Sequence, residues 1–264
     1  MGEPMEIGSA SIASDSRRGT ASIVGRSSGD HPRSFDPAGL RHLSRAKRTG
    51  DNATVVSAAS DVGTSELEAA TKPVKIEVVD LLVAADRLQQ RWDHQGIKFC
   101  FIGGIAVQHW GEPRMTNDVD VTVAGEFGAE KKLATQLLRG MQARINDAIE
   151  FATINRVLLM RDSQGISIDA SLAAMPFELG VIERSKNESI RPGISIRLCS
   201  ANDLVILKAF ANRPRDWQDI QGILVRSNHL VDRKFVREEL TILAELKEEP
   251  EIIDQLKQLF GKHR

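Results

Sequence analysis

The 264-residue sequence is poor in cysteine and in long apolar runs, and it carries almost no net charge. Its two cysteines, Cys100 and Cys199, are too few for a disulfide framework. Each lies in an apolar, strand-like run, so we expect two reduced and buried thiols. No apolar run approaches the ~20 residues that span a bilayer, and the N-terminus lacks the continuous apolar region of a secretory signal. The sequence therefore predicts a cytoplasmic protein with no membrane partner.

The net charge of −1 provides no global basic field of the kind that marks many nucleic-acid-binding proteins. A local patch is still compatible with this value. Residues 16–50 contain eight Lys or Arg against two acidic residues. We interpret this stretch as a solvated tail, with a weak electrostatic tether to RNA as the functional alternative.

Three segments differ in composition and periodicity. Residues 1–72 are rich in Ser, Gly, Ala and Arg, and they cannot bury enough apolar surface to offset the entropy lost on ordering, so we predict a disordered tail. Residues 73–200 alternate strand-like and helix-like patterns, which predicts a small mixed β-sheet flanked by helices. Residues 201–264 show only helical periodicity, which predicts a C-terminal helical bundle. The fold class is therefore α+β, with a cleft expected between the two folded parts.

Apolar periodicity and turn residues place the individual elements. Strands are expected within residues 97–104, 118–123, 154–161, 165–173 and 195–200. Helices are expected within residues 74–96, 105–111, 128–141, 201–212, 214–226, 233–246 and 250–261.

Two aspartates stand one residue apart in the predicted strand DVDVTV. Side chains at positions i and i+2 of a strand share one face, so Asp118 and Asp120 project together while Val119 and Val121 face the core. Two neighbouring carboxylates repel unless a proton or a cation lies between them, and Mg²⁺ prefers such hard oxygen ligands. Taken alone, the pair more often marks a solvated strand.

A third carboxylate and a double glycine strengthen the functional interpretation. Asp169 lies in the apolar strand ISIDASL, where an acid is costly to bury unless it is paired or metal-bound. If this strand lies beside DVDVTV, three carboxylates converge and can hold two Mg²⁺ ions about 3.5–4 Å apart. Gly103 and Gly104 follow a strand and open a helix, where backbone N–H groups can approach a phosphate.

This combination resembles the signature of the nucleotidyltransferase (polymerase-β-like) superfamily. The run GGIAVQHWGEPRMTNDVDV is most similar to AbiEii-type bacterial nucleotidyltransferases, which show an Arg-x-Thr-x-Asp-hydrophobic-Asp pattern, here Arg114 to Asp120. The resemblance continues in SANDLVILKAFANRPRDWQDIQGIL, because members carry a lysine on the first helix after the core, here Lys208. It covers residues 98–226. One departure is Gly104, where many members have a serine whose hydroxyl contacts a phosphate.

The resemblance implies an enzyme that moves an NMP from an NTP to a hydroxyl acceptor and releases pyrophosphate. Asp118, Asp120 and Asp169 would bind Mg²⁺, and Asp169 would also act as general base. Gly103 and Gly104 would contact the β- and γ-phosphates.

The remaining polar residues of the matched segments have both functional and structural interpretations. Lys208 and Arg114 would neutralise charge on the leaving phosphates, although a helix lysine is as often simply solvated. Thr116 joins the nucleotide-binding set, with capping of the turn before the strand as its alternative. Asp216 and Asp219 match the Arg/Asp-rich segment of the family, but we interpret them as surface ion pairs with the neighbouring Arg213 and Arg215.

The sequence does not identify the molecule that accepts the nucleotide. AbiEii-type relatives are toxins of toxin–antitoxin pairs, some of which act on tRNA, so RNA and an antitoxin protein are the implied partners. Other branches of the superfamily modify small molecules such as aminoglycosides. Two further alternatives are a non-catalytic binding protein of the same fold and a metal-dependent glycosyltransferase, which would explain the aspartate pair but not the double glycine.

Overall fold

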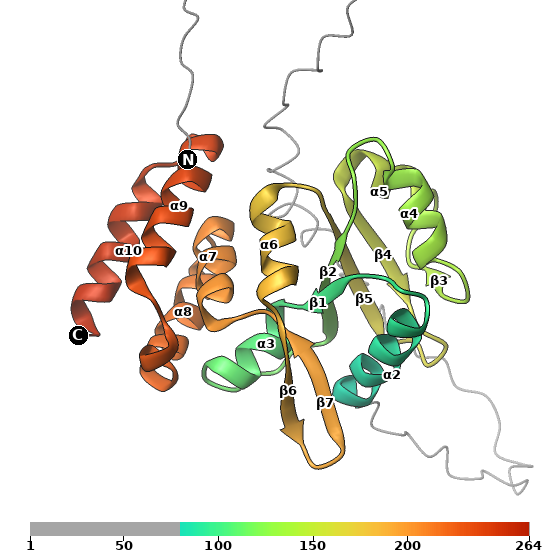
Figure 1. The fold of residues 1–264 in the computed structure, drawn as a ribbon, viewed down its shortest axis with the longest axis horizontal. Coiled ribbons are helices and arrows are strands. Elements are labelled where there is room, and N and C mark those ends of the chain that lie inside the picture. Colours follow the sequence, from blue (N-terminus) through green and yellow to red (C-terminus); the bar gives the residue numbers. More distant parts are fainter. Residues whose placement is uncertain (1–79, 264) are drawn as a thin grey trace, which may run out of the picture. The chain divides into compact units, whose positions relative to one another are not determined.

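The computed structural model describes residues 80–263, which form a mixed α+β fold (Figure 1). The tail expected over residues 1–72 lies outside this range. Within the described range, seven strands form one sheet in the order β3-β4-β5-β2-β1-β7-β6. The strands are β1 (Phe99–Phe101), β2 (Asp118–Ala124), β3 (Gln142–Ala143), β4 (Val157–Arg161), β5 (Ser167–Ala173), β6 (Lys186–Arg191) and β7 (Ile194–Leu198).

Helices precede, interrupt and follow the sheet. In the same range they are α2 (Leu81–His94), α3 (Gly103–Trp110), α4 (Glu130–Leu137), α5 (Ala148–Asn155), α6 (Pro176–Arg184), α7 (Ala201–Ala211), α8 (Pro214–Arg226), the 3₁₀ helix η3 (Asn228–Leu230), α9 (Arg233–Lys247) and α10 (Glu251–Lys262). No helix in this part of the chain is long and apolar enough to cross a membrane.

The predicted mixed sheet is confirmed, and its centre is the pair β2 and β5. Strand β2 runs parallel to β5 and antiparallel to β1. Val119 and Val121 are fully buried, whereas Asp118 and Asp120 on the other face are only partly buried. Because side chains alternate along a strand, burial of the valines fixes the direction in which both carboxylates point.

The predicted C-terminal helices are confirmed as α7 to α10, which gather on one side of the sheet (Figure 1, left). Helix α7 packs against both α8 and α9, and α10 packs against α9. Each of the last two helices buries an apolar stripe. These stripes are Val236, Leu240, Leu243 and Ala244 on α9, and Ile252, Leu256 and Phe260 on α10.

Several boundaries differ from the sequence prediction. The strand expected from residue 154 begins only at Val157, because Ile154 and Asn155 are the last residues of α5. Arg156 ends that helix in the left-handed conformation, with φ 54°. Helix α2 begins at Leu81, where the Asp80 side chain accepts a hydrogen bond from the Leu82 N–H. Five elements were not predicted: α5, α6, the 3₁₀ helix η3, and the short or edge strands β3 and β6.

The prediction of two reduced and buried cysteines is confirmed. Cys100 and Cys199 are both free thiols with no exposed surface. Burial raises the pKa of Cys100 to about 12 and also raises the pKa of Cys199. Both thiols therefore act as small apolar core groups near neutral pH.

Candidate functional site

The three predicted carboxylates converge on one face of the sheet. Asp120 and Asp169 are direct partners in the parallel register of β2 and β5, and Asp118 lies two residues before Asp120. Each of the three can offer one carboxylate oxygen such that these oxygens lie within 4.8 Å of one another. All three side chains are partly buried. The donor set is therefore chemically suited to a hard divalent cation.

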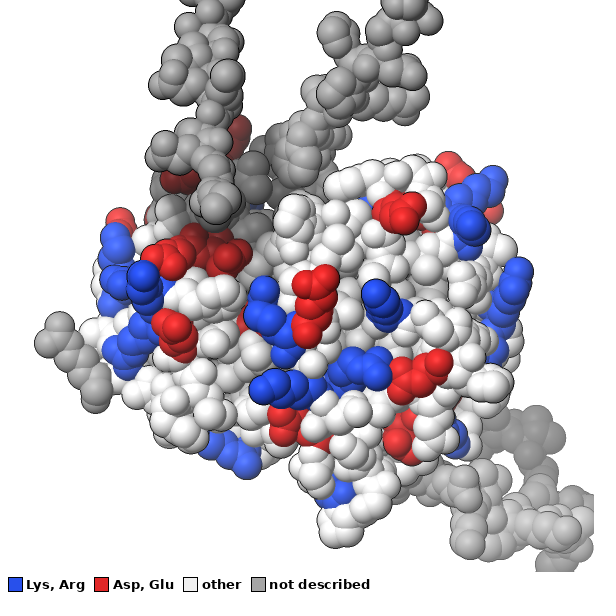
Figure 2. All heavy atoms as spheres, in the orientation of Figure 1, with Lys and Arg blue, Asp and Glu red and all other residues white. Residues whose placement is uncertain are grey.

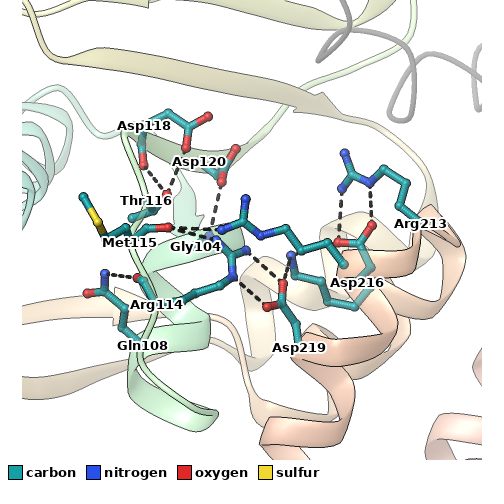
Figure 3. Close-up of polar contacts among 12 residues, drawn as sticks. Gly104, Gln108, Arg114, Met115, Thr116, Asp118, Asp120, Arg213, Asp216 and Asp219 are labelled. Atoms are coloured by element: carbon teal, nitrogen blue, oxygen red, sulfur yellow. Dashed lines mark hydrogen bonds and ion pairs between the residues drawn. The ribbon is translucent and has the colours of Figure 1, made fainter.

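Hydrogen bonds from neighbouring residues orient the two aspartates of β2 (Figure 3). The Thr116 hydroxyl donates to Oδ1 of Asp118 over 3.0 Å. The Gly104 N–H donates to Oδ2 of Asp120 over 3.2 Å. Thr116 thus contacts an acid of the site directly, and the Gly104 N–H that the sequence assigned to a phosphate is engaged with Asp120 in this structure.

Side chains of the site lie so close to Gly103 and Gly104 that both positions require glycine. Gly103 has φ +60°, and a Cβ atom placed there would lie 1.9 Å from Oδ2 of Asp120. A Cβ atom at Gly104 would lie 2.3 Å from Oγ1 of Thr116. The space that a serine at position 104 would fill is therefore occupied by Thr116, which accounts for the departure from the Gly-Ser pattern.

Asp169 has a partner that sequence reasoning missed. The Arg144 guanidinium donates to Oδ1 of Asp169 over 2.5 Å, and both side chains are mostly buried. Arg144 follows the two-residue strand β3, far from Asp169 in sequence. Only the order of the strands in the sheet brings the two residues together, and no sequence spacing signals it.

Lys208, which the sequence assigned to phosphate binding, lies within a buried ion-pair cluster. Its Nζ contacts Oδ1 of Asp216 at 3.0 Å and Oδ2 of Asp219 at 2.8 Å. Arg114 binds Asp219 through Nε at 2.6 Å and Nη2 at 2.9 Å, and Arg213 binds Asp216 (Figure 3). The cluster joins the loop before β2 to helices α7 and α8.

The prediction that Asp216 and Asp219 form surface ion pairs is wrong. The two residues are 2% and 5% exposed. Pairing with Arg213 is confirmed for Asp216. Lys208 contacts both acids, and Arg114 binds Asp219 through two nitrogens. Arg215 instead donates to the Met115 carbonyl. The error arose because partners on another helix and in a distant loop cannot be recognised from local charge spacing.

The ion pair between Asp219 and Arg114 shifts the pKa values of both residues. Burial by itself would raise the pKa of Asp219, but hydrogen bonds from Arg114 and Lys208 lower it further than burial raises it, so that the net pKa lies below the ordinary value. The hydrogen bond to Asp219 raises the pKa of Arg114. Both shifts favour the charged forms of Asp219 and Arg114.

A cavity of about 800 Å³, counted with its open mouth, lies between the sheet and helix α7. Four of the predicted site residues line it, namely Gly103, Asp120, Asp169 and Lys208. Its apolar lining includes Leu204, Leu207 and Phe210 of α7 and Val157 of β4. Arg213 also lines the cavity, and with a side chain 34% exposed it is the more accessible cation beside the buried Lys208.

Comparison with known protein families assigns most of the described residues to one family. The family model described as "Nucleotidyl transferase of unknown function (DUF2204)" matches residues 79–258. A search of curated proteins found no match.

Solved structures with a similar fold include three proteins, each of low sequence identity. A nucleotidyltransferase-like antigenic protein from Paracoccidioides brasiliensis is 16% identical, with 67% of this chain and 92% of that chain covered and a TM-score of 0.41. The antibiotic-resistance factor ANT(2'')-Ia is 13% identical, with 69% and 96% covered and a TM-score of 0.42. The lincosamide antibiotic adenylyltransferase LnuA is 12% identical, with 55% and 96% covered and a TM-score of 0.37.

Proposed function

Because the chain belongs to the DUF2204 family of nucleotidyl transferases, we propose that it moves an NMP from an NTP to a hydroxyl acceptor and releases pyrophosphate. The observation that carries the proposal is the convergence of Asp118, Asp120 and Asp169 beside the cavity. Three acids held this close repel one another, and a divalent cation bound among them lowers that repulsion further than Arg144 does by itself. A metal–triphosphate substrate supplies such a cation.

The donor set fits Mg²⁺ as the cofactor. Asp118, Asp120 and Asp169 would hold the ion, since all of their donor atoms are hard carboxylate oxygens within 4.8 Å of one another. When bound, Mg²⁺ would polarise phosphate oxygens and stabilise negative charge in the transition state. Thr116 and Gly104 keep two of these ligands oriented.

The protein residues then have separate tasks in the reaction. Asp169 accepts the proton of the acceptor hydroxyl, whose oxygen forms a new bond to the α-phosphorus. The bond from that phosphorus to the bridging oxygen of the β-phosphate breaks, and pyrophosphate leaves with the electron pair. Arg213, Lys208 and Arg114 would place positive charge near the departing phosphates. Because Lys208 is held between two acids, Arg213 is the better placed of the three to contact substrate.

The proposal has two forms, which differ in the acceptor and in the cellular setting. An AbiEii-type toxin that modifies tRNA or another RNA, paired with an antitoxin and acting in the cytoplasm, is one form of it. A small hydroxyl compound is the other form, and the apolar lining of the cavity supports this alternative. Incubation of the protein and labelled NTPs with total RNA, or with a protein-free small-molecule fraction, separates the two by the fraction that gains label.

Substitution of the acids tests the site. We expect Asp118→Ala and Asp120→Ala each to lower Mg²⁺-dependent pyrophosphate release at least ~10³-fold, because loss of a charge-stabilising group is worth several kcal/mol in the transition state. Asp254→Ala is the matched control, since Asp254 is an exposed residue of α10 that pairs with the nearby Lys257.

Three outcomes would favour other functions or contradict the mechanism. Unchanged pyrophosphate release by either Asp118→Ala or Asp120→Ala would contradict the mechanism. Stabilisation against heat by UDP-sugars but not by NTPs would favour the glycosyltransferase. Failure of the wild-type protein to bind both Mg²⁺ and NTP in calorimetry would indicate a non-catalytic member of the family.

A further inference from the structure

Four neighbouring strands align Arg144 with the acids of the site. Asp120 on β2 is the register partner of Asp169 on β5, and Asp169 is the register partner of Leu159 on β4. The Arg144 N–H donates to the Leu159 carbonyl over 3.0 Å, which continues the same row beyond the end of β3. Residues that are directly opposite on neighbouring strands share one face of a sheet. Arg144 and the acids therefore lie on the same face.

The guanidinium of Arg144 has to cross strand β4 to reach Asp169. Neighbouring strands are about 4.8 Å apart, so a side chain that starts two strands away spans the gap only if it is long and extended. Arg144 does so and donates to Oδ1 of Asp169 at 2.5 Å. The Arg144 side chain is 21% exposed and that of Asp169 is 13% exposed, so solvent screens this ion pair only in part.

We propose that Arg144 is a positioning residue for Asp169, and that its charge weakens binding of a divalent cation at the three acids. The proposal rests on the metal-dependent function proposed above. Arg144 fixes the carboxylate that takes the acceptor's proton. It also sets one positive charge against the three negative charges, which lowers their mutual repulsion while no metal is bound.

The sign of the effect on metal affinity follows from the charge of the partner. Groups that hydrogen-bond to metal ligands are usually carboxylates or carbonyls, and they make the ligand more basic. Removing such a group therefore weakens metal binding. Arg144 is a cation, and it repels a metal ion that shares the Asp169 carboxylate. Removing its charge should therefore strengthen metal binding, whereas general damage to the site should weaken it.

The test uses the full chain and Mn²⁺, whose free concentration is read by electron paramagnetic resonance. We expect Arg144→Gln to bind Mn²⁺ about tenfold more tightly than the wild-type protein. We expect Arg144→Lys, which keeps the charge, to stay within about threefold of wild type. Arg237→Gln, at an exposed position on α9, removes the same charge far from the acids and should leave the affinity unchanged.

Activity provides the second readout. Nucleotide transfer should fall at least about tenfold in Arg144→Gln even though Mn²⁺ binds more tightly, because Asp169 is no longer held in place. Equal or weaker Mn²⁺ binding by Arg144→Gln, with a wild-type thermal melt, would overturn the proposal while leaving the proposed function intact. If the wild-type protein bound no Mn²⁺ with or without NTP, the metal site itself would be wrong and this proposal would fail with it.

Discussion

At the scale of single residues, the site depends on two glycines, which have no side chain, as much as on its charged residues. Gly103 and Gly104 leave the space that Asp120 and Thr116 occupy, and this close approach lets helix α3 begin directly beside the acids. Thr116 in turn binds Asp118. A methyl group added at Gly103 should therefore displace Asp120, and one added at Gly104 should displace Thr116 and, through it, Asp118.

A pair of glycine substitutions tests this packing. In Gly104→Ala the new Cβ atom would lie 2.3 Å from Oγ1 of Thr116, so that Thr116 must move away from Asp118. We expect a loss of about 1–3 kcal/mol in the free energy of unfolding, as for other overpacked sites, together with loss of nucleotide transfer.

Gly261→Ala is the matched control for this experiment. Gly261 lies in helix α10, where an added Cβ atom meets nothing within 4 Å. Because alanine favours helices over glycine, this variant should be neutral or up to ~1 kcal/mol more stable in urea unfolding. Equal stability of the two variants would contradict the close approach seen at Gly104.

The acids of the site could be predicted from sequence, but most of their partners could not. Alternation of valine and aspartate in DVDVTV was enough to place Asp118 and Asp120 on one face. Asp169 could be added because an acid in an apolar strand needs a partner. Arg144 could not be found, since its contact depends on β3, a strand of only two residues with an unremarkable sequence.

At the scale of elements, an ion-pair cluster connects the C-terminal helices to the acid-bearing strand. Asp219 on α8 binds Lys208 on α7 and Arg114 in the loop before β2. The cluster thereby fixes the loop that also carries Thr116, the partner of Asp118. The helices are in this way part of the site and more than a cover for the sheet.

Removal of one charge from this cluster should destabilise the fold. Asp219→Asn leaves Lys208 and Arg114 with less compensation, and breaking a buried ion pair by changing one partner costs about 2–4 kcal/mol here, where Arg114 is partly exposed. Urea unfolding at pH 7 measures the loss. Asp254→Asn, which disrupts an exposed pair on α10, should change stability by less than ~0.5 kcal/mol.

The pH dependence of this difference has a definite sign. Because the pKa of Asp219 is lowered in the folded protein, its contribution is complete above the ordinary aspartate pKa of about 3.9 and is lost as the pH falls through the lower folded-state value. The stability gap between wild-type protein and Asp219→Asn should therefore narrow below about pH 4. A gap that stays constant down to pH 3 would show that the charge of Asp219 is not the source of the effect.

Periodicity predicted the long elements and missed those with an unusual pattern. Helices α8, α9 and α10 carry clear apolar stripes and were placed almost to the residue. Helix α5 was missed because its apolar residues are spread around the helix and do not form one stripe. One of them, Ile154, is exposed near the end of the helix. Strand β6 was missed because KNESIR is an edge strand that faces solvent with most of its side chains.

At the scale of the whole molecule, the net charge and the face shown in Figure 2 show no large excess of one sign. Lys and Arg residues alternate with Asp and Glu over the face shown in Figure 2, and no broad area of one sign covers it. The net charge of the chain is −1. We therefore expect the cavity and its rim, or the basic stretch 16–50 outside the described range, to determine specificity toward the acceptor.

The identity of the transferred group tests the central claim most directly. The full-length protein is incubated with Mg²⁺ and an NTP labelled on either the α- or the γ-phosphate, in the presence of total RNA or small-molecule extract, and acceptor-bound label is counted. We expect label from the α-phosphate to appear in one acceptor fraction, label from the γ-phosphate to leave as pyrophosphate, and Asp120→Ala to abolish the transfer. Transfer of the γ-label, no transfer to either fraction, or undiminished transfer by Asp120→Ala would contradict a nucleotidyltransferase site at the three aspartates.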